Sequence, residues 1–308
     1  MFGVKTFGHL GTLDPIASGL LLIALGEATK MIPYLEGIGH KAQGIKEYLF
    51  SIQWGIETDT GDITGKSIEH RVQSTDSEPN LCPSSDALEM AMAALTGEID
   101  QVPPAYSAVH VNGVRAYQLA RAGRAVELPP RLVTVYELKE EGKRNKEKDK
   151  ITTALSDVFA GTAENLFLLP SSLFFLRCSP GTYVRSIVRD IAKLCGTIAT
   201  TGSIRRTKTH GFDIKDAVTL DLLEKLFNND PALFRTHLRP LDFGLDDIPV
   251  ADIGGDAAIL FQHGGFVERY SGLGIRDSGI VRVYSDEKFI GIGQIEDKLL
   301  KPKRIIKQ

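Results

Sequence analysis

The order of apolar and polar positions along the chain predicts short strands and helices in an irregular sequence. Apolar runs with aromatic or β-branched members are typical of strands, whereas apolar positions three and four residues apart are typical of helices. Strands are expected over 20–25, 48–54, 132–138, 173–178, 279–284 and 289–295. Helices are expected over 85–95, 115–122 and 183–194. Because strands and helices do not alternate regularly, the pattern predicts an α+β fold rather than a doubly wound parallel sheet.

Single residues mark where several of these elements begin and end. Ser85 is expected to cap the first helix and Gly97 to end it. Asn112-Gly113 predicts a tight hairpin turn, because both residue types accept positive φ angles. The third helix is expected to bury one apolar face, made of Val184, Ile187, Val188 and Ile191.

The chain is expected to form two domains. The boundary is predicted within 240–249, so that residues 1–240 form the larger domain and 241–308 a small β-rich one. The stretch 139–150 is almost entirely charged, with both signs mixed, and cannot bury a core. We therefore expect an exposed insertion within 139–170.

Composition narrows the class of protein. The hydrophobic share of 43% and the charged share of 24% are those of an ordinary globular protein. No apolar run reaches about eighteen residues, the length of a membrane span, and the N-terminus lacks the pattern of a signal peptide. Three cysteines at no metal-like spacing argue for a reducing cytoplasm and against disulfides or a zinc site; they are Cys82, Cys178 and Cys195.

Total charge is a poor guide to the partner of this chain. The formal net charge is -3, yet nucleic-acid binding depends on a local basic face rather than on the sum. Basic residues do gather in three places, which are Arg185 with Arg189 and Lys193, 205–208, and 301–307. For each cluster taken alone, an ordinary solvated surface is the favoured interpretation.

One carboxylate stands in a loop whose composition restricts its position. Asp14 precedes Pro15, whose ring disfavours a helical conformation of the residue before it. Glycines that permit tight turns or close approach surround it, namely Gly8, Gly11 and Gly19. The run over 20–25 follows and is expected to be a buried strand. A fixed acid in this place suits an enzyme nucleophile, although Asp-Pro is also a common turn dipeptide.

Other segments match motifs of nucleotide-binding or metal-binding sites only in part. Residues 60–67 nearly spell a phosphate-binding loop, but Thr60 stands where the pattern requires its first glycine, and a strand-like stretch follows instead of a helix. Glu57, Asp59 and Asp62 could be metal ligands, although an acidic turn is the commoner explanation for such spacing. The histidines show no ligand pairing at helical spacing, so no metal site is expected. Residues 291–293 lack the third glycine of a dinucleotide fingerprint.

Residues 8–30 (GHLGTLDPIASGLLLIALGEATK) closely resemble the catalytic motif of the TruB-type tRNA pseudouridine synthases. Three further blocks resemble the same family in the same order: KEYLF with the later DT in 46–60, QVPPAYSA in 101–108, and SPGTYVRS with the later IRR in 179–206. The end of the chain is similar, less specifically, to a small RNA-binding PUA-type domain. Family members usually begin with a strand and a K-P-x-G-x-T-S segment. Here Met1 lies only thirteen residues before Asp14, so that element is expected to be missing.

The resemblance implies a fold, a reaction and a partner. The fold would be the pseudouridine synthase catalytic fold, with a mixed, mostly antiparallel sheet flanked by helices, plus the PUA-like domain. The reaction would be isomerisation of uridine to pseudouridine at position 55 in the T loop of tRNA, on a base flipped out of its stack. It needs no cofactor, and neither a membrane nor a protein partner is implied.

The resemblance also implies roles for single residues. Asp14 would be the nucleophile or base, Arg185 its bidentate partner, and Tyr48 the ring that stacks on the flipped uracil. The substrate would further meet His9, Tyr183, Ile204, Arg205 and Arg206, the last two on phosphates. Two of these residues have alternatives: Arg185 could be a surface helix arginine, and Tyr183 could belong to the core.

Two rival functions remain at this stage. The first is a tRNA-binding folding factor without chemistry, which the missing N-terminal segment makes conceivable. The second is a nucleotide hydrolase that works from the loop 61–67.

Overall fold

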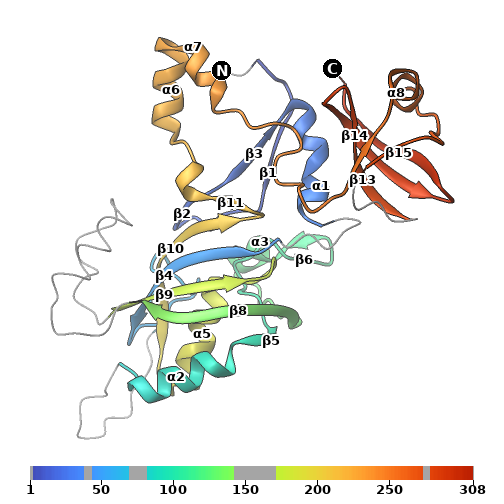
Figure 1. Cartoon of the computed structure of the whole chain (residues 1–308). Helices are drawn as coiled ribbons and strands as arrows, with labels where there is room; N and C mark the ends of the chain where they lie inside the picture. The colour runs from blue at the N-terminus through green and yellow to red at the C-terminus, as the bar shows by residue number, and fades with distance from the viewer. Residues whose placement is uncertain (1–2, 38–43, 69–81, 142–170, 273–277, 308) are drawn as a thin grey trace, which may run out of the picture. The chain divides into compact units, whose positions relative to one another are not determined.

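The computed structural model describes residues 3–37, 44–68, 82–141, 171–272 and 278–307. Internal contacts divide the chain into two compact units, both shown in Figure 1. The central unit comprises Leu13–Leu20 and Ile45–Thr209. The terminal unit comprises Met1–Thr12, Leu21–Gly44 and His210–Gln308.

A mixed sheet forms the core of the central unit. Its strands lie in the order β10-β4-β9-β8-β5 with antiparallel neighbours, and β2 pairs in parallel with β10. These strands are β2 (Ala17–Gly19), β4 (Lys46–Trp54), β5 (Gly97–Gln101), β8 (Arg131–Glu141), β9 (Ser171–Cys178) and β10 (Ala199–Thr209). The expected α+β fold, with a mixed and mostly antiparallel sheet, is confirmed.

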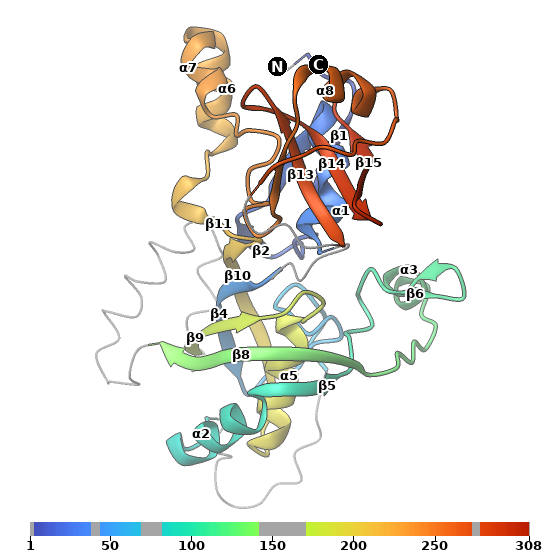
Figure 2. The same ribbon diagram turned by 45° about the vertical axis from the view of Figure 1, so that its right-hand side comes forward.

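Two helices, α2 (Ser85–Ala94) and α5 (Val184–Leu194), pack against this sheet (Figures 1 and 2). All four residues of the predicted apolar face of α5 are buried, in one cluster with side chains from α2, β4 and β9. Phe50 of β4 and Phe174 of β9 stack there, with ring centroids 5.5 Å apart. Burial of this apolar stripe is what holds α5 in place, because helix propensity alone contributes little to helical stability in proteins.

Most predicted boundaries are correct to within a residue. The cap of α2 is Ser84 rather than Ser85, since the Ser84 hydroxyl accepts from the Ala87 N–H at 3.2 Å. Asn112 and Gly113 have φ angles of 49° and 83°, which confirms the hairpin turn between β6 (His110–Val111) and β7 (Val114–Arg115). The short helix α3 (Ala116–Arg121) follows directly.

The pattern did not predict β10, the strand between β4 and β2. Its residues are mostly Thr, Ser and Arg, which neither alternate clearly in polarity nor form an apolar run. Nevertheless eight of its eleven residues are buried. Some of these polar side chains bond to a neighbouring strand, as where the Ser203 and Ser51 hydroxyls bond at 2.7 Å. Hydrophobic periodicity cannot detect a strand that buries polar residues on both faces.

The terminal unit contains two sheets. The first pairs β1 (Phe7–Leu10) with β3 (Leu22–Leu25); the second has the order β12-β13-β14-β15, with β12 and β13 parallel. The strands of the second sheet are β12 (Val250–Asp252), β13 (Gly279–Ser285), β14 (Lys288–Glu296) and β15 (Leu299–Ile305). The other elements are η1 (Gly26–Met31), α1 (Ile32–Leu35), β11 (Phe212–Asp213), η3 (Ile214–Asp216), α6 (Leu220–Asn229), α7 (Pro231–Thr236) and α8 (Gly255–Gln262).

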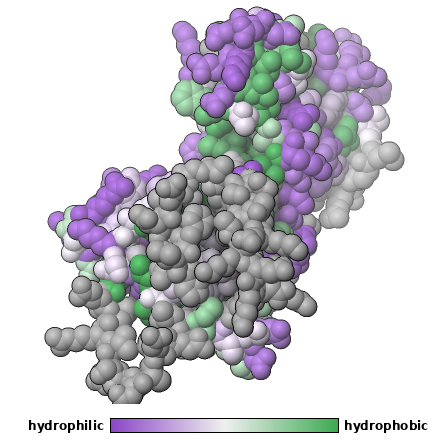
Figure 3. All heavy atoms as spheres, turned by 90° about the vertical axis from the view of Figure 1, so that its left-hand side faces the viewer, coloured by the Kyte–Doolittle hydropathy of each residue, from purple (hydrophilic) through white to green (hydrophobic). Residues whose placement is uncertain are grey.

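The strand expected over 20–25 is present as β3, but the prediction that it is buried is wrong. In β3 only Ala24 is buried, and Ile23 is 56% exposed. A ribbon of two strands lacks the neighbours that would cover both faces, which is the physical reason for the difference. On the face drawn in Figure 3, hydrophobic side chains lie among hydrophilic ones at the surface.

One core of the terminal unit joins the early and late parts of the chain. Met31 and Tyr34 pack with Leu245 and Ile248, which precede β12, and with Ile292 of β14. The β-rich C-terminal part is confirmed by β12–β15. The division at 240 and 241 stays a prediction.

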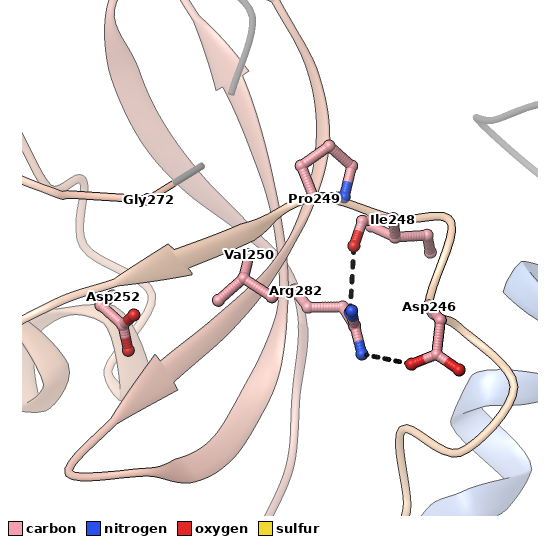
Figure 4. Close-up of a pocket in the computed structure, with 7 residues that line it drawn as sticks. All are labelled: Asp246, Ile248, Pro249, Val250, Asp252, Gly272 and Arg282. Atoms are coloured by element: carbon pink, nitrogen blue, oxygen red, sulfur yellow. Dashed lines mark hydrogen bonds and ion pairs between the residues drawn. The ribbon is translucent and has the colours of Figure 1, made fainter. Parts of the chain in front are cut away.

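A buried arginine anchors the segment that leads into β12. The Arg282 Nε donates to the Ile248 carbonyl oxygen at 3.0 Å, and its Nη1 lies 3.3 Å from the Asp246 carboxylate (Figure 4). Asp242 lies 3.5 Å from the same nitrogen. The guanidinium thereby helps to fix a stretch of irregular backbone before β12.

The charged insertion begins later than expected. Lys139 and the two residues after it continue β8, where alternate residues share a face of the sheet. There the Lys139 ammonium lies 3.2 Å from Glu137 and 3.3 Å from Glu141. The rest of the expected insertion, 142–170, lies outside the described residues. Within the described ranges, no helix is long and apolar enough to cross a membrane.

The pairing of β2 with β10 predicts that Gly19 cannot be replaced. A Cβ there would lie 2.3 Å from the Arg206 carbonyl oxygen, and φ is +98°. Gly97 has a similar φ of +103° with open space around it. Gly97→Ala is expected to lower the free energy of unfolding by about 1–3 kcal/mol through backbone strain alone. Gly19→Ala is expected to lower it by about 1–3 kcal/mol more, because the added methyl group overlaps the Arg206 backbone. Equal losses in urea titrations would contradict the close contact.

Candidate functional site

Asp14 lies at the start of a tight turn before β2. The Ala17 N–H donates to the Asp14 carbonyl oxygen at 2.8 Å, which closes a four-residue turn. Pro15 occupies the second position, where its fixed φ favours such turns. The backbone therefore fixes the direction of the carboxylate. Its side chain remains 29% exposed.

Arg185 binds this carboxylate through both oxygens. Its Nε donates to Asp14 Oδ2 at 2.8 Å and its Nη2 to Asp14 Oδ1 at 2.9 Å. Arg185 is the second residue of α5, and its side chain is only 3% exposed. The bidentate geometry matches a planar guanidinium to a planar carboxylate, which a lysine cannot reproduce.

The same guanidinium also binds two other loops. Its Nη1 donates to the Thr60 carbonyl oxygen at 2.9 Å, and its Nη2 donates to the Tyr106 carbonyl oxygen at 2.9 Å. The buried Asp62 carboxylate lies 3.8 Å from Nη1. Four hydrogen bonds from a group with five N–H donors leave it largely committed to the protein. Arg185 therefore connects Asp14 to the loops that contain Thr60 and Tyr106.

The loop that resembles a phosphate-binding motif folds onto itself. Asp62 Oδ1 accepts from the Thr64 N–H and from the Thr60 hydroxyl, each at 3.0 Å. Asp59 Oδ1 accepts from the Lys66 N–H at 2.8 Å. These carboxylates stabilise a turn, as the acidic-turn alternative states. The described part of the chain has no group of three or more His, Cys, Asp or Glu residues that could hold a metal ion.

Tyr48 lies buried on β4, near Asp14. Burial raises the pKa of its phenol well above the ordinary value of 10.0; Cys178 and Asp14 add to the rise, while Arg206 opposes it. Arg206 also forms a side-chain hydrogen bond with this phenol. The buried phenol thus stays neutral at ordinary pH.

The remaining predicted site residues lie in different surroundings. Ile204 is buried on β10 in the main core, and Arg205 next to it is partly exposed. Tyr183 precedes α5 and packs against Val109, Ala116 and Leu128, as its core alternative states. His9 is exposed on β1 and belongs to the terminal unit.

Arg206 corrects one expectation. Its side chain does not lie on a surface that a phosphate could reach, because the residue is only 1% exposed. Instead its Nε donates to the Leu20 carbonyl oxygen at 2.8 Å. It stands opposite Tyr48 and Gly19 in the pairings of β10 with β4 and β2. The motif match identified Arg206 as a site residue. The sequence around an arginine in a strand does not show whether its side chain faces solvent or the protein interior.

Several residues of the site escaped the sequence analysis. Thr60 and Tyr106 act through backbone carbonyls, for which a sequence contains no signal. Asp62 was considered only as a metal ligand or turn residue, and Gln101 only as part of a motif block. Proximity of these segments to Arg185 follows from the fold alone.

Comparison with known families and proteins gives a consistent result. Residues 1–162 match the model of the TruB family pseudouridylate synthase N-terminal domain. Residues 185–246 match the tRNA pseudouridylate synthase B C-terminal domain, and 249–306 match the pseudouridine synthase II TruB C-terminal domain.

Individual relatives cover nearly the whole chain. The chain is 35% identical over 307 residues to tRNA pseudouridine synthase B of Ehrlichia chaffeensis, covering 99% of this chain and 91% of that protein. It is 35% identical over 312 residues to the protein of the same name from Gluconacetobacter diazotrophicus, covering 99% and 90%. A chain from a Cbf5-Nop10-Gar1 complex shares the fold, with a TM-score of 0.62 at 19% identity, over 98% of this chain and 77% of that one.

Substitution of Arg185 is expected to destabilise the central unit strongly. In Arg185→Lys a single ammonium group replaces the planar guanidinium and cannot reach all of its acceptors. The buried carbonyl groups of Thr60 and Tyr106 then lose their hydrogen-bond donors. We expect a loss of about 3 kcal/mol in the free energy of unfolding, measured by urea titration. Arg189→Lys, one turn later on the exposed side of α5, is the control and is expected to change it by less than about 0.5 kcal/mol. Similar losses in both variants would contradict the connecting role of Arg185.

The buried phenol of Tyr48 predicts a pH dependence of stability. Its pKa is raised in the folded state, so the contribution is complete below the unfolded pKa near 10.0 and is lost as the pH rises above it. Tyr48→Phe is expected to reduce the decline between about pH 10 and pH 11 by up to about 1.4 kcal/mol per pH unit. Tyr136→Phe, at an exposed tyrosine, is the control. An unchanged slope in Tyr48→Phe would show that the phenol is not shielded.

Proposed function

Because the chain belongs to the TruB family of pseudouridylate synthases and is a tRNA pseudouridine synthase, we propose that it acts at position 55 in the T loop, with Asp14 as nucleophile. The reaction breaks the bond between ribose and uracil N1, turns the base, and joins ribose to C5; C5 loses its proton and N1 gains one. No electrons and no phosphate are exchanged, so the proposal includes no cofactor. The T stem-loop of tRNA is the proposed partner.

The observation that supports Asp14 most is its bidentate pair with Arg185. Each carboxylate oxygen has about two lone-pair sites and gives only one of them to the guanidinium. The side chain remains partly exposed, so that a substrate can approach it. A carboxylate oriented in this way needs little reorganisation when the base arrives, which is the main physical requirement on a catalytic group.

The other predicted site residues have proposed roles that follow from the resemblance to the family. Tyr48 would stack on the flipped uracil, with a contribution of about 1–3 kcal/mol. Ile204 would complete the apolar wall of the pocket, and Tyr183 would line it. His9 would contact the RNA loop. Arg205 and the basic residues of 301–307 would bind phosphates, which supports affinity rather than choice of base.

The same proposal covers domains and location. Residues 1–240 would carry out the chemistry, and 241–308 would act as a PUA-like RNA-binding domain. We place the protein in the cytoplasm, where a reducing environment suits three cysteines that form no disulfide.

Replacement of Asp14 tests the proposal directly. Asp14→Asn keeps the shape of the side chain and removes the charge and the nucleophilic oxygen pair, so pseudouridine formation at position 55 is expected to be undetectable. Binding to tRNA is expected to stay within about threefold, since phosphate contacts dominate affinity. Pseudouridine is mapped in unmodified tRNA after incubation with each variant, and binding is measured by filter retention.

Asp190→Asn is the matched control, because Asp190 is a partly exposed carboxylate on α5 that pairs with Arg189. It is expected to retain wild-type activity. Pseudouridine formation by Asp14→Asn would refute the role of Asp14 as nucleophile. Product at a position other than 55 would refute the site, and tRNA binding by the wild type without any product would favour a folding factor.

A further inference from the structure

Gln101 connects the edge strand of the central sheet to the start of α5. Its Oε1 accepts a hydrogen bond from the Tyr183 backbone N–H at 2.8 Å, and its Nε2 donates to the Tyr183 carbonyl oxygen at 3.3 Å. Gln101 is the last residue of β5 and is 1% exposed, so water does not compete for these bonds. One amide therefore binds both backbone polar groups of the residue at which the helix begins.

The start of α5 depends on this outside support. Helices usually begin at Ser, Thr, Asp or Asn, whose side chains bond to the first free N–H groups. Tyr183 makes no such side-chain bond. In a capping box, a Glu or Gln from within the helix bonds back to the N–H of the capping residue. Here Gln101 supplies that bond from a strand 82 residues away in sequence.

A second bond ties the same segment to α5. The Ser186 hydroxyl donates to the Val102 carbonyl oxygen at 2.7 Å, directly beside Gln101. A few residues further on, the Tyr106 carbonyl accepts from Arg185 at 2.9 Å. The segment that begins at Gln101 thus holds the helix that bears Arg185 and also supplies one of the acceptors of Arg185.

We propose that Gln101 is a positioning residue of the active site, which fixes the first turn of α5 so that Arg185 meets Asp14 through both oxygens. The inference rests on the proposed function of Asp14. Arg185 is the second residue of the helix, so any shift of the helix start moves its guanidinium. A misplacement of about 1 Å in an active site lowers the rate about a hundredfold. Gln101 acts only through Arg185 and takes no part in the chemistry.

The test replaces Gln101 by methionine, which has nearly the same length and makes neither bond. Gln53→Met is the matched control, because Gln53 is also buried but lies on β4, opposite Thr200 and Ser171. The first measurement is the NMR signal of the Arg185 Nε–H in protein labelled with ¹⁵N-arginine, assigned by its loss in Arg185→Lys. The second is single-turnover formation of pseudouridine in unmodified tRNA, together with the Kd for that tRNA.

In Gln101→Met the Arg185 Nε–H signal is expected to shift and broaden, the single-turnover rate to fall about ten- to a hundredfold, and the Kd to change less than about twofold. In Gln53→Met the signal and the rate are expected to match the wild type. An unchanged Arg185 signal in Gln101→Met would overturn the proposal whatever the activity. This signal needs no turnover, so it decides the role of Gln101 even if the wild type forms no pseudouridine, which would refute the proposed function instead.

Should Gln101→Met fail to fold, Gln101→Asn answers the same question. It keeps a neutral amide but is one methylene shorter, so the amide cannot bond both backbone groups of Tyr183 as Gln101 does. A shifted or broadened Arg185 signal in this variant supports the proposal, and an unchanged signal overturns it.

Discussion

The guanidinium of Arg185 is the interaction on which the candidate site depends. It joins a turn, two loops and the first turn of a helix through four hydrogen bonds at 2.8–2.9 Å. An arginine near a helix N-terminus is unfavourable by itself, because the helix dipole places partial positive charge there. The carboxylates of Asp14 and Asp62 offset this charge. The arrangement is stable only as a whole, since removal of either kind of partner leaves buried polar groups without compensation.

Arginine serves a similar purpose at three places in the structure. Arg185, Arg206 and Arg282 are all buried, and each donates to a backbone carbonyl oxygen of an irregular segment. Carbonyl groups of loops lack the partners that a β-sheet provides. The planar guanidinium group, with five N–H donors, can supply those hydrogen bonds instead. Arg185 binds Asp14 itself and the Thr60 carbonyl, and Arg206 binds the carbonyl of Leu20, a few residues after Asp14. Buried cations thus add to the turn and to the apolar contacts of Ile16 and Ala17 in holding the carboxylate in place.

The sequence predicted those parts of the fold that depend on local chemistry. The apolar stripe of α5, the Asn112-Gly113 turn and the strand β4 could be predicted because burial and turn geometry require those residue types. Motif resemblance also indicated Asp14 and Arg185, whose ion pair the structure contains. The polar strand β10, the exposure of β3 and the burial of Arg206 could not be predicted, because each depends on neighbours distant in sequence. The same holds for Gln101, whose two bonds become meaningful only when β5 and α5 meet.

The pairing of β2 with β10 has a consequence for biosynthesis. The Leu20 carbonyl receives its hydrogen bond from a residue 186 positions later, and the Gly19 backbone lies against that same residue. Contacts so distant in sequence form slowly, because a long loop must close before any of them is gained. During translation, the segment containing Asp14 leaves the ribosome long before its partners exist. The turn that begins at Asp14 therefore lacks these contacts through most of elongation. A nascent chain interrupted before β10 cannot form the pairing of β2 with β10.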